Sequence, residues 1–302
     1  MNQLAIIIPY YKIDFFEETL QSVAAQTNKN FTLYIGNDSS PDAPLSLIQK
    51  YFKEKEYKYF DYKENLGGKN LALQWERILE NVTEEWFQIL GDDDMIAENF
   101  VEEFYNNLPL AKKENANVLK FSQCFINESG IQTNDFTHYP KISSSKLIWR
   151  SKFIDQHRSS LSEHIFSTNS YKKHHFTTFP LAWFSDDLAV LEWSNGQNII
   201  FIDEAKVFVR MSALNISSLT NNDCEKEKAR CQYLEIILNK YSHFLTTEEL
   251  QKEYDFYLYL AWKNKHQSKL KFLPIYLRIK PWFKLFSIPY HKYLLYQNSK
   301  IN

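Results

Sequence analysis

The sequence has little cysteine and no long apolar run, and its first residues do not have the pattern expected of a leader segment. Cys124, Cys224 and Cys231 form neither a disulfide framework nor a metal-binding spacing, which predicts a reducing compartment. No window reaches the roughly 18 apolar residues that a membrane span needs. The start, MNQLAIIIPYY, has no basic region and no cleavage site of a signal peptide. These absences predict a cytoplasmic protein, or one held peripherally on the inner face of the plasma membrane.

Acidic residues are absent from one end of the chain. All 37 Asp and Glu lie before Phe256, whereas nine of the 35 Lys and Arg follow it. The chain therefore joins an acidic body to a basic tail. Aromatic residues make up 16% of the 302 residues, a content that excludes a disordered or low-complexity protein. No repeat and no Gly/Ser or Pro linker interrupts the chain, so we expect one domain with appended C-terminal helices.

Apolar runs alternate with helical patterns along the first 126 residues. A near-continuous apolar run such as Leu4 to Pro9 is typical of a strand covered on both faces of a parallel sheet. The alternation predicts an α/β fold with a βαβ sheet. Strands are expected at residues 4–9, 31–35, 57–62, 86–90, 118–126, 199–202 and 206–210. Helices are expected at 15–24, 45–52, 70–79, 160–174, 188–193, 224–241 and 247–263, and another is expected to start near residue 97. Asp14 is expected to cap the first of these helices.

Three consecutive aspartates, Asp92, Asp93 and Asp94, follow the apolar strand that begins at Trp86. Like charges at this density repel one another, but Mg²⁺ or Mn²⁺ bound to carboxylate oxygen and substrate phosphate would offset the repulsion. In an open α/β sheet, ligands bind at the carboxyl ends of the strands, where this cluster is expected. The alternative is a solvated acidic turn that caps the helix starting near Ala97.

Six motifs follow one another in the order typical of one enzyme family. The chain resembles the family 2 glycosyltransferases of GT-A fold: a first strand ending in proline, an Asp-rich turn, an Asn-x-Gly element, an aspartate cluster, an acidic pair, and a late Arg before a small polar segment. One departure concerns the aspartate motif, whose common first Asp is replaced by Gly91. The motifs are Ile6–Tyr11, Asn37–Asp42, Asn65–Asn70, Gly91–Asp94, Asp186–Asp187, and Arg210 with Asn215–Ser218.

The resemblance implies a GT-A domain over residues 1–218, with a mixed, mainly parallel sheet flanked by helices. Its nucleotide-sugar half would span residues 1–96 and its acceptor half 97–218. Residues 219–302 would form a helical C-terminal extension with a basic aromatic tail.

The resemblance also implies an inverting transferase that moves a hexosyl or N-acetylhexosaminyl group from a nucleotide-sugar, with a UDP-sugar favoured. The acceptor would be a hydroxyl of a glycan or lipid-linked glycan in surface polysaccharide synthesis. The expected nucleotide-sugar-binding residues are Pro9, Tyr11, Asp38, Asn65, Lys69, Asp92, Asp93 and Arg210. For some of these an ordinary role is the alternative: Asp38 can form an Asx-turn or helix cap, and Lys69 or Arg210 can be solvated surface residues.

Metal binding and proton transfer complete the expected site. We expect Mg²⁺ or Mn²⁺ on Asp94 with Asp93, where it would neutralise charge on the leaving diphosphate. Asp187, or failing it Asp186, is the expected base that takes the acceptor's proton; the alternative is a cap of the following helix. Glu163 and Trp183 are the residues expected to contact the acceptor. The alternative for each is an ordinary role in the core or on the surface.

The basic aromatic tail at residues 269–296 is expected to contact an anionic membrane surface, with packing on the domain as the alternative. Nucleic acid is not expected as a partner, because the body is acidic. A glycoside hydrolase would also use two carboxylates, but it needs neither a nucleotide pocket nor three adjacent aspartates. The alternative function is a non-catalytic nucleotide-sugar-binding protein on a decayed transferase scaffold, which Gly91 suggests.

Overall fold

The structure is a computed structural model that describes residues 2–213 and 222–279. The chain divides into two compact units, the first comprising Met1–Thr178 and Ser185–Leu219 and the second Phe179–Phe184 and Thr220–Asn302. The boundary that the sequence predicts at residue 218 takes no account of residues 179–184, which belong with the C-terminal helices.

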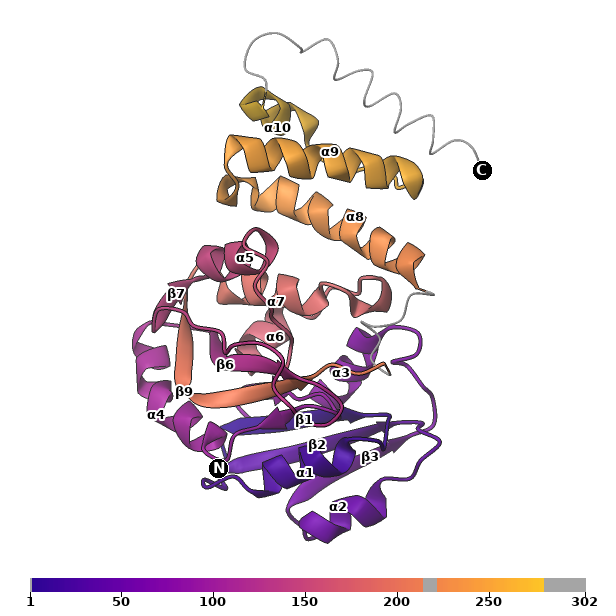
Figure 1. Ribbon diagram of the computed structural model, residues 1–302, viewed down its shortest axis with the longest axis vertical. Helices are drawn as coiled ribbons and strands as arrows, with labels where there is room; N and C mark the ends of the chain where they lie inside the picture. The colour runs from indigo at the N-terminus through magenta and orange to yellow at the C-terminus, as the bar shows by residue number, and fades with distance from the viewer. Residues whose placement is uncertain (1, 214–221, 280–302) are drawn as a thin grey trace. The chain divides into compact units, whose positions relative to one another are not determined.

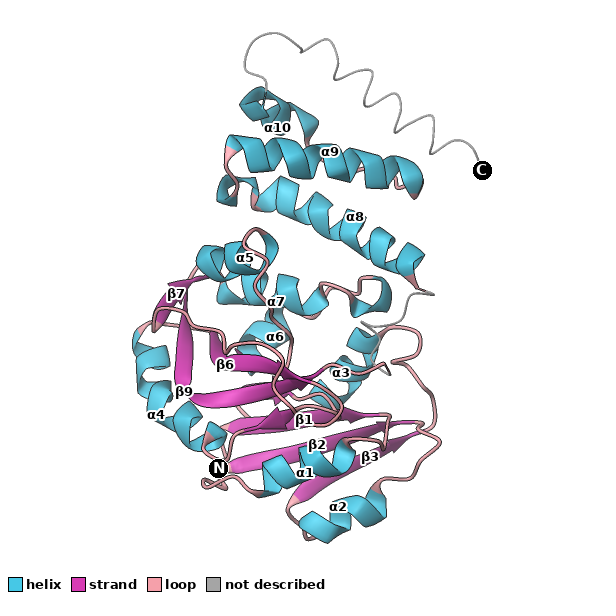
Figure 2. Ribbon diagram, viewed as in Figure 1, coloured by secondary structure: helices cyan, strands magenta, loops and turns pink. Residues whose placement is uncertain are grey.

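Four parallel strands form one half of the sheet of the first unit, in the order β3-β2-β1-β4. The central strand β1 is apolar and, apart from the half-buried Pro9, completely buried, because neighbours hydrogen-bond to both of its edges and helices cover both of its faces. Figures 1 and 2 show β1, β2 and β3 side by side with their carboxyl ends at one edge. Their bounds are β1 Leu4–Tyr10, β2 Phe31–Asp38, β3 Tyr57–Tyr62 and β4 Trp86–Ile89.

The other half of the sheet is mixed. Strand β8 (His164–Ser167) is antiparallel to both β4 and β6 (Val118–Ile126), and β6 is parallel to β9 (Asn198–Arg210). Two short strands, β5 (Met95–Ile96) and β7 (Ile142–Ser144), each pair antiparallel with β9. The mixed α/β sheet predicted from the sequence is confirmed.

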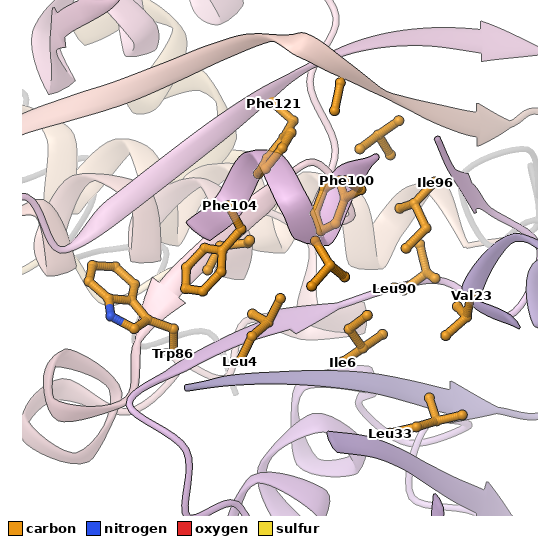
Figure 3. Packing of buried hydrophobic residues seen from close by; sticks show 14 of the residues in the cluster. Leu4, Ile6, Val23, Leu33, Trp86, Leu90, Ile96, Phe100, Phe104 and Phe121 are labelled. Carbon is orange, nitrogen blue, oxygen red and sulfur yellow. The ribbon is translucent and has the colours of Figure 1, made fainter. Parts of the chain in front are cut away.

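Alternation along β1 decides which helices cover which face. Leu4, Ile6 and Ile8 join the core cluster formed with helices α1, α2 and α4, part of which is drawn in Figure 3. On the opposite face α3 packs so closely that a Cβ at Gly36 would lie 2.4 Å from Ile78. The helices of this unit are α1 Phe16–Ala24, α2 Leu45–Tyr51, α3 Leu71–Leu79, α4 Phe100–Lys113, α5 Ser145–Phe153, α6 Thr168–His174 and α7 Ser185–Ser194.

Some predicted elements differ from those observed. Asp14 does not cap α1: the N-cap residue is Phe15, and no side chain supplies a capping hydrogen bond. Residues 160–174 are not one helix, because β8 takes the central place between β4 and β6; a short buried strand has no distinctive period in sequence. The two strands expected at 199–202 and 206–210 are one strand, β9, whose register against β6 shifts at a bulge.

The second unit is helical in the part that the structure describes. Helix α8 (Asp223–Lys240) packs against α9 (Thr247–Lys263), and α10 (Phe272–Ile279) packs on α9. A capping box between Thr246 and Glu249 starts α9. Residues 180–182 form a short 3₁₀ turn, and the following Phe184 stacks on Tyr233 of α8 with ring centroids 4.7 Å apart. Within the described ranges, no helix combines the length and apolarity needed to cross a bilayer.

Candidate active site

The first group of candidate residues gathers at the carboxyl ends of β1, β2 and β4, which are neighbours in the sheet. Asp92 joins two of these ends: its Oδ2 accepts hydrogen bonds from the backbone N–H groups of Tyr11 at 2.7 Å and Lys12 at 2.8 Å. The Tyr11 side chain is exposed. Pro9 lies inside β1, paired with Gly36. Asp92 therefore fixes the loop that carries Tyr11.

Asp38 organises the loop after β3. Its two carboxylate oxygens accept hydrogen bonds from Leu66 N at 2.8 Å and Gly67 N at 2.7 Å, and its Oδ1 pairs with the Arg77 guanidinium. A Cβ at residue 67 would lie 2.5 Å from Asp38 Oδ2, so this turn requires glycine. Burial raises the pKa of Asp38, and the two amides and Arg77 oppose that rise.

Arg77 is a site residue that the motifs do not reveal. It projects from α3, lies 3.8 Å from the centre of the Tyr62 ring, and donates to the Glu64 carbonyl at 2.9 Å. It contributes hydrogen-bond donors beside the Asp38 acceptor. Nearby, Asn65 Oδ1 accepts from Gly68 N at 2.5 Å, and Lys69 forms an exposed pair with Glu64.

Asp94 and Asp93 differ sharply in their surroundings. Asp94 is 6% exposed, and its two oxygens accept hydrogen bonds from Arg210 N at 2.8 Å and from the Ser162 hydroxyl. The half-buried Asp93 carboxylate accepts no hydrogen bond from any other residue that the structure describes. Burial, followed by the charges of Asp94 and Asp92, raises the pKa of Asp93 to about 8.

The aspartate cluster fits a divalent cation better than it fits an isolated turn. Burial also raises the pKa of Asp94 to about 6, against the hydrogen bonds from Ser162 and Arg210. A cation would relieve the desolvation and mutual repulsion that cause both shifts. In the described part of the chain, no three His, Cys, Asp or Glu side chains are grouped to hold a metal. Substrate phosphates and water would therefore have to complete its coordination, which is the usual arrangement for Mg²⁺.

Arg210 does not have the role expected of it. Its side chain is fully buried, and its guanidinium donates to the carbonyls of Asp93 at 3.0 Å and of Asn127 and Glu128 at 3.1 and 3.0 Å. It also pairs with Glu18 at 2.5 Å. A guanidinium enclosed in this way is not available to a diphosphate, so the predicted direct contact is wrong for the structure described. Arg210 instead ties the end of β9 to the backbone of the aspartate cluster.

The acidic pair lies in the first turn of α7, where carboxylates favour the helix dipole. Asp187 accepts a hydrogen bond from Lys152 Nζ at 2.5 Å. Burial and the neighbouring Asp187 charge raise the pKa of Asp186 to about 7, against the opposing effect of Lys152. The two carboxylates thus differ: Asp187 is paired with a partly buried ammonium, and the pKa of Asp186 is raised toward neutrality.

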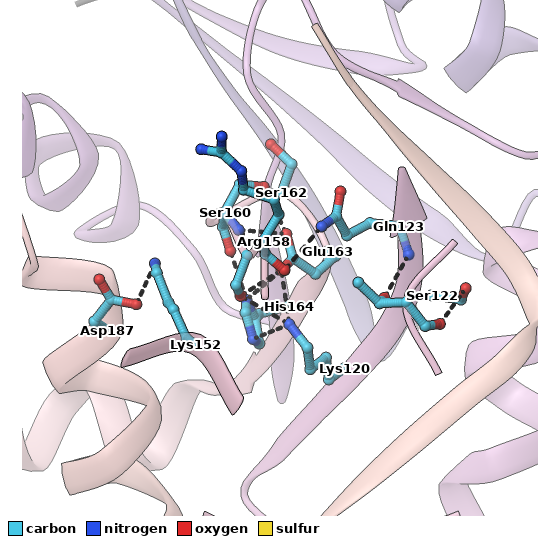
Figure 4. A network of polar contacts seen from close by, with 12 residues as sticks. Lys120, Ser122, Gln123, Lys152, Arg158, Ser160, Ser162, Glu163, His164 and Asp187 are labelled. Carbon is cyan, nitrogen blue, oxygen red and sulfur yellow. Dashed lines mark hydrogen bonds and ion pairs between the residues drawn. The ribbon is translucent and has the colours of Figure 1, made fainter. Parts of the chain in front are cut away.

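Glu163 is also misassigned by the sequence reading. Its side chain is fully buried, and its carboxylate accepts hydrogen bonds from Lys120 Nζ at 2.7 Å, from the Ser159 hydroxyl at 2.6 Å, and from the Ser160 amide and hydroxyl (Figure 4). These donors, with Lys120 foremost, hold its pKa well below the usual range although burial alone would raise it. A filled and enclosed carboxylate cannot contact an acceptor sugar, so the expected acceptor role is withdrawn.

The remaining expected residues lie elsewhere in the chain. Trp183 belongs to the second unit, where the Lys226 ammonium lies 5.1 Å from the centre of its ring. The polar segment at residues 215–218 lies outside the described residues, as does the part of the tail from 280 to 296.

Comparison with known proteins identifies the family. The model of glycosyl transferase family 2 matches residues 5–185. A teichoic acid poly(glycerol phosphate) polymerase of Staphylococcus epidermidis is 33% identical over 116 residues, 35% of this chain and 15% of that protein. An uncharacterized glycosyltransferase of Rickettsia typhi is 34% identical over 119 residues, 39% of this chain and 35% of that protein. The matches therefore span at most about a third of these relatives.

A solved structure shows the same fold. The crystal structure of S. aureus TarS 1-349 in complex with UDP-GlcNAc superposes with a TM-score of 0.65 over 92% of this chain and 79% of that one, at 17% identity. The predicted GT-A architecture is thereby confirmed. Because the family model covers more than half of the residues, the chain belongs to glycosyl transferase family 2.

Proposed function

We propose that this chain is an inverting glycosyltransferase that moves a sugar from a nucleoside-diphosphate sugar to an acceptor hydroxyl. The observation that carries the proposal is the half-buried Asp93 carboxylate beside Asp94 at the carboxyl end of β4, which accepts no hydrogen bond from another of the described residues. Such a site holds negative charge that only a bound cation or proton relieves. It lies at the sheet edge where α/β folds bind nucleotides.

The donor side would be built from the loops after β1, β2 and β3. The Asp38 acceptor and the Arg77 donors complement the imide edge of a pyrimidine, which carries one N–H between two carbonyls. This pairing favours a UDP-sugar. Tyr11 is exposed to line the same pocket, and Lys69 could leave its exposed partner Glu64 for a phosphate.

Asp93 and Asp94 would hold Mg²⁺ or Mn²⁺ with the donor's phosphates, and Asp93 is the side chain with room for this. When bound, the cation neutralises charge on the leaving diphosphate. Asp92 holds the Tyr11 loop against this edge and takes part in binding through that loop.

Proton transfer is assigned to the acidic pair on α7. Asp187 is the proposed base, and the hydrogen bond from Lys152 Nζ orients its carboxylate. Asp186, with a pKa of about 7, is the substitute candidate because a base poised near the working pH is efficient. The carboxylate would take the acceptor's proton as the hydroxyl oxygen attacks the anomeric carbon and the diphosphate leaves. A single displacement of this kind inverts the configuration.

The acceptor we propose is a glycan or lipid-linked glycan of a cell-surface polymer. The name of the S. epidermidis relative, a teichoic acid polymerase, supports this class, and the UDP-GlcNAc bound to TarS supports a hexosyl or N-acetylhexosaminyl donor group. Trp183 remains a proposed sugar contact, since a ring with a cation near its face can also receive an apolar sugar face.

A peripheral position on an anionic membrane from the cytoplasmic side would suit such an acceptor. In α10, Leu273 and Leu277 are 52% and 43% exposed, and no acidic residue follows Phe256. Exposed apolar side chains with nearby Lys and Arg favour binding to anionic lipid. Replacing both leucines by serine should weaken co-sedimentation of the protein with anionic vesicles at low salt. Unchanged co-sedimentation would remove α10 from the proposed membrane contact.

The alternative function, nucleotide-sugar binding without turnover, rests on Gly91 in place of the common first aspartate. The two functions are separated by incubating the full chain with nucleotide-sugars, in Mg²⁺ or Mn²⁺ and in chelator. A transferase should release free UDP from one of them only with metal, and that sugar should also raise the melting temperature. Stabilisation without UDP release, even with a glycan acceptor present, would favour the binding protein. If no nucleotide-sugar either releases UDP or raises the melting temperature, both proposed functions are overturned.

A further inference from the structure

Ser162 links two parts of the first unit that are 68 residues apart in sequence. It lies between α5 and β8 and is 3% exposed. Its hydroxyl accepts a hydrogen bond from Gly91 N at 3.1 Å and donates one to Asp94 Oδ2. Its carbonyl accepts from Gln88 Nε2 at 2.6 Å. One serine therefore holds β4, the turn that follows it, and the second carboxylate of the proposed metal site.

Gly91 leaves the space into which Ser162 draws that carboxylate. A Cβ at residue 91 would lie 2.8 Å from Asp94 Oδ2 and 3.1 Å from Asp93 Oδ1. Real Cβ atoms essentially never lie within 3.0 Å of another heavy atom, so any larger residue at 91 requires the Asp94 carboxylate to shift. The common first aspartate of the family motif would occupy this same space. The loss of that aspartate and the hydrogen bond from Ser162 are thus geometrically coupled.

The buried pair between Lys120 and Glu163 fixes Ser162 in turn. Glu163 follows Ser162 directly, and its carboxylate gathers the Ser159 and Ser160 donors together with Lys120 of β6 (Figure 4). The residues on either side of Ser162 are therefore anchored to the sheet through Glu163 and Lys120. An anchored hydroxyl can hold a carboxylate in one orientation, which a mobile one cannot.

We propose that Ser162 is a positioning residue for the metal site, and that Gly91 provides the space in which Ser162 holds the Asp94 carboxylate. They set the orientation of Asp94 without themselves touching the cation. The inference rests on the proposed function, because it requires that Asp93 and Asp94 bind a cation with the donor.

The test measures Mn²⁺ binding by the full chain in the presence of UDP, using the electron paramagnetic resonance signal of free Mn²⁺. Ser162→Ala should weaken Mn²⁺ binding about tenfold, the usual consequence of losing one hydrogen bond to a charged group. Ser160→Ala is the matched control: it removes a hydroxyl from the same segment without touching Asp94, and the Ser160 amide still binds Glu163. The control should lose thermal stability at most and keep wild-type Mn²⁺ affinity.

Gly91→Ala provides a second route to the same carboxylate. It should also weaken Mn²⁺ binding, and combining it with Ser162→Ala should cost less than the sum of the two losses, because both act through Asp94. The inference is overturned if Ser162→Ala binds Mn²⁺ as the wild type does, if Ser160→Ala loses as much, or if the two losses simply add. If the wild-type chain binds no Mn²⁺ with UDP, the proposed function fails, and the inference fails with it.

Discussion

Glu163 and Asp93 are two acidic residues of the same unit with opposite surroundings. Glu163 is fully buried, yet Lys120 and the serine donors fill its carboxylate and lower its pKa. Asp93 is less buried but receives no hydrogen bond from another described residue, and its pKa rises to about 8. A buried charge with complete pairing destabilises the fold only when a partner is removed, whereas burial without pairing costs stability that a ligand can restore. The contrast assigns Glu163 a structural role and supports the ligand-binding role proposed for Asp93.

The largest effect is expected when Asp93 loses its charge. Asp93→Asn should lower turnover about 10²- to 10³-fold, the usual cost of removing one group that stabilises transition-state charge. The same substitution should raise the melting temperature, since it removes the repulsion with Asp94 and Asp92. Steady-state kinetics and calorimetry on one preparation measure both. Lower stability together with lost activity would mean that Asp93 is structural after all.

Asp94→Asn provides the matched comparison within the cluster. It should lower turnover to a similar extent and weaken binding of the nucleoside diphosphate, because the site loses a charged ligand. Unlike Asp93→Asn it should not stabilise the fold, because Asn can accept only one of the two hydrogen bonds from Ser162 and Arg210 at a carbonyl oxygen. Full activity in Asp94→Asn with unchanged metal dependence would remove this residue from the metal site.

The complementary prediction concerns Glu163, which should matter for stability and not directly for chemistry. Glu163→Gln leaves the Lys120 ammonium buried without its counter-charge, a change that typically costs about 3–5 kcal/mol in free energy of unfolding. Lys120→Met combined with Glu163→Gln should recover much of that loss, since the unpaired charge is then gone. Urea denaturation monitored by fluorescence gives both values. A Glu163→Gln protein as stable as the wild type would break the contrast with Asp93.

The surroundings of the aspartate cluster are easier to predict from sequence than those of Glu163, and the reason is physical. Strand β4 and its aspartates are local in sequence, so an apolar run followed by repelling charges predicts a strand end with a ligand. Glu163 has its partners on β6 and in its own loop, and Arg210 has its partners on three separate elements. Nothing in the local sequence shows that these charges would be paired with distant groups. Ser162, Arg77 and Lys152 were missed for the same reason.

The helices and strands predicted correctly are likewise those whose determinants are local in sequence. Strand β3 and helix α9 have the bounds that their patterns indicate, because each has a clear period or cap of its own. Strand β8 was predicted as part of a helix, because its strand state depends on pairing with β4 and β6. Helix α5 was not predicted, although Ser144 caps it by accepting from Leu147 N at 3.2 Å.

A smaller effect is expected from the acidic pair on α7. Asp187→Asn should lower turnover by roughly 10²-fold or more while leaving donor binding nearly intact, as for loss of a general base. If Asp186→Asn is the inactive variant instead, the two roles exchange. In that case activity should rise as the pH increases through about 7, because Asp186 must lose its proton to act. If neither substitution lowers turnover, the base lies elsewhere.

The smallest expected effect is a pH dependence of stability caused by His164, the residue that follows Glu163. Burial, followed by the charge of Lys120, lowers the pKa of His164 to about 3 from the usual 6.5, so the folded protein keeps this imidazole neutral. The charges and polar groups around it are Lys120 of β6, Glu163, the Ser160 carbonyl and Lys152 of α5. Below pH 6.5 the unfolded chain binds a proton that the folded chain does not, so stability falls as the pH falls from 6.5 toward 3. The slope for one proton is about 1.4 kcal/mol per pH unit.

His164→Gln should reduce that slope between pH 6 and 5, where Glu163 does not yet contribute. Glu163 adds to the loss only below its usual pKa of 4.5, because its folded pKa is lower still. Asp93 and Asp186 act in the opposite direction: their raised pKa values make the folded state the stronger proton binder, so each favours the fold as the pH falls through its own value. Urea denaturation of the wild type, His164→Gln and Asp93→Asn at pH 5, 6 and 7 separates these contributions. A wild-type slope that His164→Gln leaves unchanged would show that the imidazole accepts a proton inside the fold, and that the polar cluster around Glu163 is less closed than its hydrogen bonds indicate.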